Sequence, residues 1–154
     1  MSLQDTLQTL EVFCELDENE IAEVAQIVME KDVPVGQPLF VEAMKGETLF
    51  IVLEGTASVT RKLEDGREVQ LYVAEGGDFL GSLSLFEPGE RRVSAKTIEP
   101  SKILIIRRKD FLKLADKSPK TAFRFAFELV RASLEKLNDM AEVHVETIEA
   151  LKKA

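Results

Sequence analysis

Hydrophobic and polar residues follow three successive patterns along the chain. Over the first pattern the apolar positions Leu3, Leu7 and Leu10 recur at helical spacing, so a short amphipathic helix is expected there. Asp17, with Glu20 three positions later, has the form of a capping box that opens a second helix. The expected apolar face of that helix comprises Ile21, Val24, Ala25 and Val28.

Beyond Lys31 the second pattern replaces helical spacing with short apolar runs separated by glycine and proline. Asp65 and Gly66 form one such break and suit a tight hairpin turn. Strands without long intervening helices favour an antiparallel sheet over a parallel α/β arrangement. The expected strands cover residues 33–35, 39–41, 49–53, 56–62, 68–73, 93–98 and 103–107.

The third pattern is helical again and runs from Arg108 to the end of the chain. Ser118 and Pro119 interrupt it, after which residues 120–153 contain neither glycine nor proline. A helix of that length is about 50 Å long, more than a domain of this size covers. The three patterns predict an α+β fold: an antiparallel β-roll or jelly-roll barrel with short N-terminal helices and a long C-terminal helix. Residues 1–119 would form the β-roll unit, and residues 120–154 the long helix of the same domain.

Apolar residues of the long helix recur at alternating spacings of four and three, which is a heptad repeat. This repeat predicts a homodimer held together through residues 123–151. The alternative is a helix that folds back along its own barrel. The seam comprises Phe123, Phe127, Val130, Leu134, Leu137, Ala141, His144, Ile148 and Leu151.

His144 is the one titratable side chain at a core position of this seam. A neutral histidine packed near a fraying helix end is one interpretation. The other is a pair of facing imidazoles whose protonation loosens the dimer, because histidine changes its charge within the physiological pH range.

Composition and charge narrow the range of functions. The chain has 154 residues, 45% of them hydrophobic, which is enough for one domain with a substantial core. Its formal net charge of −8 argues against a partner held mainly through phosphates. The single cysteine, Cys14, excludes an intramolecular disulfide framework and fits a reducing cytoplasm; its apolar neighbours predict that it is buried. Because the apolar runs are short, no membrane association is expected.

One stretch, residues 76–97, contains candidate binding chemistry. A glycine turn leads into a short apolar segment, and a loop with Pro88 and Gly89 then leads to Arg91, Arg92 and Ser94. A short helix opening at Gly81 would present free backbone N–H groups, and an arginine would add charged donors, so the stretch can hold an anion. An ordinary loop with surface arginines is the alternative.

The order Gly-Asp-Phe-x-Gly-x-Leu-x-Leu, followed by a loop and Arg-x-x-Ser, resembles the phosphate-binding cassette of the cyclic-nucleotide-binding domain family. That family includes catabolite-activator-type transcription factors and kinase regulatory subunits. Gly81 and Leu83 match the family pattern, Arg91 takes the place of the phosphate-binding arginine, and Ser94 that of a small hydroxyl residue. Ser82 departs from the pattern, since the family has a glutamate there that accepts the ribose 2′-hydroxyl.

The resemblance implies a small anionic ligand, cyclic AMP or cyclic GMP, that binds weakly or not at all without the glutamate. Arg91 would pair with the phosphate, and Ser82 would lie beside the ribose. Arg92 is the second choice for the anion, because it should point away from Arg91 on a strand. Further hydrogen bonds to the phosphate would come from Ser94 and from backbone N–H groups around Leu83 and Ser84, and the base would be covered by Phe123, Arg124, Phe127 and Arg131.

Two functions remain open at this point. The first is a ligand-sensing regulatory module that transmits occupancy through the C-terminal helix to an unknown downstream protein. The second is a degenerate, non-binding structural or protein-interaction domain of the same fold. An enzyme is not expected, because a cupin metal site needs clustered histidines and the only histidine lies on the long helix; no metal is expected either. No helix-turn-helix is predicted after that helix, which disfavours direct binding to DNA.

Overall fold

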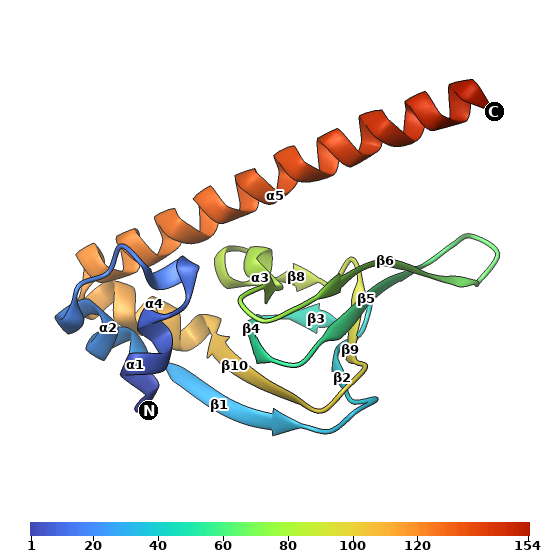
Figure 1. Cartoon of the computed structure of the whole chain (residues 1–154). Helices are drawn as coiled ribbons and strands as arrows, with labels where there is room; N and C mark the ends of the chain where they lie inside the picture. Colours follow the sequence, from blue (N-terminus) through green and yellow to red (C-terminus); the bar gives the residue numbers. More distant parts are fainter.

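The computed structural model describes residues 1–154 and confirms the α+β architecture. Two antiparallel sheets lie beside a group of helices, which come from the N-terminal and C-terminal parts of the sequence. The last helix is long and extends outward from this group (Figure 1). The helices are α1 Leu3–Gln8, η1 Glu11–Phe13, α2 Glu18–Ala25, α3 Ser82–Phe86, α4 Arg108–Lys117 and α5 Pro119–Lys153. The strands are β1 Val28–Val33, β2 Pro38–Phe40, β3 Lys45–Gly46, β4 Thr48–Glu54, β5 Ala57–Lys62, β6 Glu68–Ala74, β7 Phe79–Leu80, β8 Gly89–Glu90, β9 Ser94–Thr97 and β10 Ser101–Arg107.

The capping box predicted at α2 is present. The Asp17 carboxylate accepts a hydrogen bond from the Glu20 N–H at 2.9 Å, and the Glu20 carboxylate accepts one from the Asp17 N–H at 2.9 Å. The helix is shorter than the sequence suggested. It ends at Ala25, and Val28 already belongs to β1, where it pairs with Ile106 of β10. Val28 is apolar in either setting, so helical periodicity alone did not separate the two elements.

The strands form two four-stranded sheets and one small ribbon. One sheet has the order β1-β10-β4-β7 and the other β2-β9-β5-β6, while β3 pairs with β8. Every pairing is antiparallel. The hairpin between β5 and β6 turns at Gly66, whose φ of +85° is the left-handed conformation predicted for this turn.

The central strand β4 divides the interior into two parts. Leu49 and Ile51 point into the cluster formed with the helices, whereas Phe50 and Val52 point into the cluster between the two sheets. All four side chains are buried because β4 has a packed layer on each face. The β-roll is therefore fixed to the helical group through a single shared strand layer.

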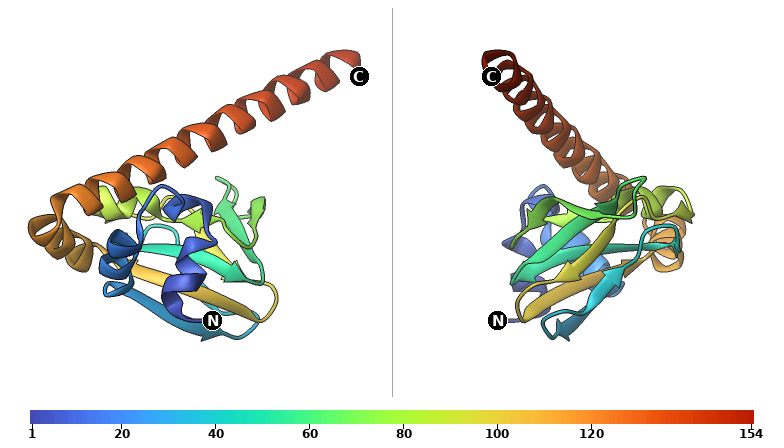
Figure 2. Two further views of the ribbon diagram at one scale, coloured as in Figure 1. Left: turned by 60° about the vertical axis from the view of Figure 1, so that its left-hand side comes forward. Right: turned by 90° about the vertical axis from the view of Figure 1, so that its right-hand side faces the viewer.

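The long helix α5 packs only through its N-terminal part. Phe125 and Leu129 are buried in the core, and Phe125 stacks on Phe13 at 5.0 Å between ring centroids. From Leu137 onward every residue is exposed, and this part extends beyond the barrel (Figure 2). Cys14 is exposed at the end of η1, so its predicted burial was wrong; its apolar neighbours Val12 and Phe13 fill the core instead. None of the helices combines the length and apolar character needed to cross a membrane.

Candidate functional site

Arg91 is the charged side chain that the fold places deepest within the predicted cassette. The β3–β8 ribbon, in which Gly46 opposes Gly89, brings its backbone beside the loop that precedes β3. The Arg91 N–H donates to the Met44 carbonyl at 2.7 Å, and the Ala43 N–H donates to the Arg91 carbonyl at 2.8 Å. These bonds direct the side chain inward, where only 7% of the residue is exposed.

The guanidinium of Arg91 is only partly satisfied. Its Nη2 donates to the Thr48 carbonyl at 2.8 Å, while Nε and Nη1 are buried and have no hydrogen-bond partner. Burial lowers the pKa of this guanidinium, because a charged group loses hydration in the interior. Buried donors without partners are rare and cost free energy. The two unpartnered nitrogens are therefore suited to donate hydrogen bonds to an anionic ligand.

The predicted short helix at Gly81 is present as α3. Gly81 caps it with a φ of +77°, and the Ser84 N–H turns back to the Gly81 carbonyl at 3.1 Å. Ser82 is partly exposed, Leu83 is exposed and Ser84 is buried. Because α3 is a single turn, its dipole is small, and the positive charge at this site comes mainly from Arg91.

Arg92 directly follows Arg91 in the loop between β8 and β9, and Ser94 begins β9. The Ser94 hydroxyl oxygen accepts a hydrogen bond from the Glu42 N–H at 2.8 Å, so this oxygen already fixes the loop after β2. Arg92 is exposed, unlike its neighbour Arg91. Of the two neighbouring arginines, Arg91 is thus the one whose side chain lies in the interior of the cassette.

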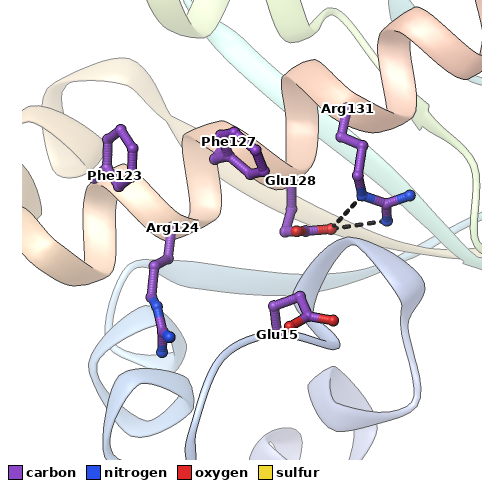
Figure 3. A pocket seen from close by; sticks show the side chains of 6 residues that line it. All are labelled: Glu15, Phe123, Arg124, Phe127, Glu128 and Arg131. Atoms are coloured by element: carbon purple, nitrogen blue, oxygen red, sulfur yellow. Dashed lines mark hydrogen bonds and ion pairs between the residues drawn. The ribbon is translucent and has the colours of Figure 1, made fainter.

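The residues predicted to cover a base lie elsewhere on the chain surface. Phe123 and Phe127 are 67% and 57% exposed and contact each other, with 6.1 Å between ring centroids. They line a hollow of about 420 Å³ together with Glu15, Arg124, Glu128 and Arg131 (Figure 3). None of the cassette residues lines this hollow. The predicted contact of these side chains with a base stays a prediction.

Three of the four charged side chains in that hollow are paired, namely Arg124, Glu128 and Arg131. Arg124 Nη1 donates to the buried Glu20 carboxylate at 2.9 Å. Arg131 holds Glu128 through Nε at 3.0 Å and Nη2 at 2.8 Å, and these hydrogen bonds raise the pKa of Arg131 above its usual value. The Arg124–Glu20 pair joins α5 to α2, and Arg131 Nη2 lies 3.7 Å from Glu11 of η1. The Arg131–Glu128 pair drawn in Figure 3 lies within α5 itself. No group of three or more His, Cys, Asp or Glu side chains is arranged to hold a metal ion.

Sequence analysis missed the residues that surround the Arg91 guanidinium. Phe40 and Phe50 lie against it, and Gly46 and Thr48 border it. The available signal was Gly46, which marks a place where another group approaches the backbone. Its partner lies 45 positions later in the sequence, so the pattern around Gly46 did not identify what approaches.

Comparison with known proteins shows which family the chain resembles. The family model described as "Cyclic nucleotide-binding domain" matches residues 30–118. A "CRP-like cAMP-activated global transcriptional regulator" of Mycobacterium tuberculosis is 32% identical over 96 residues, which cover 62% of this chain and 43% of that protein. The chain spans about half the length of the curated relatives that it matches.

Solved structures agree with the fold. The N-terminal domain of a transcriptional regulator from Streptomyces coelicolor is 31% identical, with a TM-score of 0.74, and the match covers 89% of this chain and 95% of that one. A cyclic nucleotide-binding domain from Methylobacillus flagellatus has a TM-score of 0.84 at 14% identity, over 94% of this chain and 82% of that one. At that identity the second likeness concerns the fold alone.

The relatives also correct one expectation. Two of them are named as cAMP-activated global transcriptional regulators, which contradicts the inference from the sequence that direct binding to DNA is disfavoured. That inference was drawn from residues corresponding to only about half of each regulator. The fold of one domain does not determine whether a protein that contains it also binds DNA.

Proposed function

Because the chain belongs to the cyclic nucleotide-binding domain family, we propose that it is a ligand-sensing regulatory module. The ligand is a cyclic nucleotide, cyclic AMP or cyclic GMP, whose phosphate meets Arg91 in the cassette. Occupancy is passed to α5, which follows the cassette in the chain and carries the signal outward. The naming of its relatives as cAMP-activated regulators supports this assignment.

The observation that carries the proposal is the buried, unpartnered pair of donors on Arg91. A structural arginine in the interior is expected to satisfy its N–H groups with carbonyls or carboxylates. Arg91 satisfies one and leaves Nε and Nη1 free. A phosphate supplies charged acceptor oxygens for both, and such charge-assisted hydrogen bonds are among the stronger ones in proteins.

The test is calorimetric titration of the protein with cyclic AMP and with cyclic GMP. Arg91→Ala removes the proposed phosphate donor, and Arg92→Ala is the matched control because that neighbour is exposed. Binding that Arg91→Ala abolishes and Arg92→Ala preserves supports the proposal. Absence of heat and of a thermal shift up to millimolar ligand would show that the fold has kept the cassette without binding a nucleotide, as in the alternative of a structural or protein-interaction domain.

Ser82 determines how tightly the site binds in this proposal. By the family resemblance, Ser82 stands where the family has a glutamate beside the ribose. A hydrogen bond to such a charged partner contributes roughly 1.5 to 3 kcal/mol to binding. We therefore expect cyclic AMP to bind about ten- to a hundredfold more tightly to Ser82→Glu than to the unchanged protein. An unchanged affinity would contradict the placement of Ser82 at the ribose.

The proposal extends to a homodimer formed through α5. The seam from Phe123 to Leu151 is exposed along its whole length, including Leu134 and Leu137. A continuous apolar stripe of this kind on a free helix is typical of a helix that pairs with another. A second copy of the chain would cover it, and the resemblance favours a parallel arrangement.

A further inference from the structure

The central carbon of the Arg91 guanidinium, Cζ, lies over the ring of Phe40. The distance from Arg91 Cζ to the Phe40 ring centroid is 4.5 Å, and to the Phe50 centroid 5.7 Å. The two rings also contact each other, with centroids 5.6 Å apart and planes tilted by 35°. Phe40 is separated from Arg91 by 51 positions in the sequence, and β2 and the loop after it bring the two together.

Few other contacts fix the plane of this guanidinium. It makes one hydrogen bond, to the Thr48 carbonyl. Its remaining edge borders two glycines, because a Cβ on Gly46 would lie 2.0 Å from Nε and one on Gly81 would lie 2.3 Å from Nη1. Glycine offers no side chain to stack on, and neither Nε nor Nη1 has a hydrogen-bond partner, so the orientation of the plane depends largely on the rings.

Of the two rings, Phe40 can be substituted with less effect on the packing of the core, so its contact with Arg91 can be tested by itself. Phe50 is buried in β4, farther from the guanidinium. Phe40 is only half-buried and closes the three-residue strand β2 at the edge of its sheet. A cation over an aromatic face is attracted to the ring, and the attraction grows as water is excluded.

We propose that Phe40 is a positioning residue of the anion site, which acts by holding the Arg91 guanidinium flat beneath its ring. The ring occupies the face of the group and leaves the in-plane donors Nε and Nη1 for the ligand. A planar donor held in this way selects anions that present two oxygens to its edge, as a phosphate does. The identity of the ligand rests on the proposed function, whereas the position of the guanidinium does not.

The first test needs no ligand. The Nε–H resonance of Arg91, assigned by its loss in Arg91→Lys, should be shifted upfield by the ring and should exchange slowly with water. Phe40→Leu keeps apolar bulk but removes the aromatic face, so the resonance should move downfield and exchange faster. Phe40→Tyr keeps the face and should leave it nearly unchanged. Tyr72→Leu, at an exposed ring on β6, is the control for loss of an aromatic side chain.

The second test measures the affinity for cyclic AMP in the same variants. We expect Phe40→Leu to weaken binding on the order of tenfold, Phe40→Tyr to stay within about twofold, and Tyr72→Leu to have no effect. In the Arg91→Lys background, Phe40→Leu should cause no further loss, because a lysine has no plane to orient. Equal behaviour of Phe40→Leu and Phe40→Tyr, or an unmoved Nε–H resonance in Phe40→Leu, would overturn the proposal. If the unchanged protein does not bind cyclic AMP, the proposed function fails. The Nε–H resonance then tests by itself whether Phe40 positions the guanidinium.

Discussion

Lys136 and Asp78 join the long helix to the turn that leads into the cassette, with 3.5 Å between Lys136 Nζ and Asp78 Oδ1. The same ammonium lies 4.4 Å from the ring centroid of Phe79 and 3.5 Å from the Phe79 carbonyl oxygen. Phe79 begins β7, two positions before Gly81. This contact lies where the packed part of α5 ends, so under the proposed function it is the place where a movement of the cassette would reach the helix.

The first prediction concerns this contact. Lys136→Met keeps the length of the side chain but removes its charge, so the links to Asp78 and Phe79 are lost. We expect the free energy of unfolding to change by less than about 1 kcal/mol, because partly exposed ion pairs contribute little. Backbone hydrogen exchange should nevertheless accelerate in residues 79–81 and 133–140. Lys152→Met, at an exposed position near the end of α5, is the control, and equal exchange in both variants would contradict the coupling.

The second prediction separates backbone strain from collision at the cassette glycine. Gly66 and Gly81 both have a positive φ, of +85° and +77°. A Cβ on Gly66 meets nothing within 4 Å, whereas on Gly81 it would lie 2.3 Å from Arg91 Nη1 and 2.9 Å from the Thr48 carbonyl oxygen. Gly66→Ala should therefore cost only the left-handed strain, roughly 1 to 2 kcal/mol. Gly81→Ala should cost roughly 2 to 5 kcal/mol in total because crowding is added.

Urea unfolding of both variants measures this difference. Combining Gly81→Ala with Arg91→Ala should recover part of the loss, since the guanidinium is then no longer in the way. Equal destabilisation by Gly66→Ala and Gly81→Ala would show that the cassette accommodates a side chain at Gly81 without disturbing Arg91.

Elements with a local cause were predictable from the sequence. The Asp17–Glu20 capping box and the Gly66 turn each depend on residues within three positions of one another, and both are present. The length of α5 follows from an uninterrupted helical stretch. The end of α2 was predicted less well, because Val28 fits either a helix or a strand until its pairing with Ile106 is known.

The surroundings of Arg91 depend instead on contacts between distant segments. Phe40 and Thr48 reach the guanidinium from β2 and β4, and the register that brings them there is set by the sheets. Arg124 illustrates the same difficulty. Its proposed contact with a base, taken from the resemblance, stays a prediction, whereas its ion pair was not foreseen because the rotation of α5 about its axis is fixed by buried Phe125 and Leu129. That rotation turns Arg124 toward Glu20.

The third prediction tests that ion pair. Glu20 is 4% exposed and accepts hydrogen bonds from both the Asp17 N–H and Arg124 Nη1. Arg124→Ala leaves a buried carboxylate without its cation. We expect a loss of roughly 1 to 3 kcal/mol in the free energy of unfolding, less than for a fully buried pair because Arg124 reaches solvent. Arg92→Ala, at an exposed position, is the control. A cost for Arg124→Ala no larger than for Arg92→Ala would show that the pair does not hold α5 in place.

The fourth prediction concerns the seam of α5. Leu137 is 61% exposed, so Leu137→Glu adds a charge at a site that the fold of one chain does not bury. Its thermal unfolding as a monomer should be unchanged, whereas two carboxylates facing each other in an apolar seam should dissociate the dimer. Sedimentation velocity over a concentration series measures this. Asn138→Glu, one position outside the seam, is the matched control. Equal association of both variants would place the dimer contact elsewhere.

The fifth prediction concerns the only histidine, His144, which occupies a core position of the same seam. Its neighbours one turn away along α5 are Met140, Ala141, Thr147 and Ile148, none of which carries a charge. An imidazolium in a closed seam would therefore lack a carboxylate from its own helix and would face a like charge from the partner copy in a parallel pair.

Protonation of His144 in both copies of the proposed dimer would place two like charges in the apolar seam, so the affinity between the two copies should fall as the pH decreases. Sedimentation at about pH 5.5 and about pH 8 measures this affinity on either side of the histidine titration. His144→Leu keeps the apolar core position without a titratable group, so it should dimerise equally at both pH values. Since all carboxylates remain in that variant, it also controls for the general change in net charge. Equal affinity of the unchanged protein at both pH values would mean that the imidazoles do not meet in the seam.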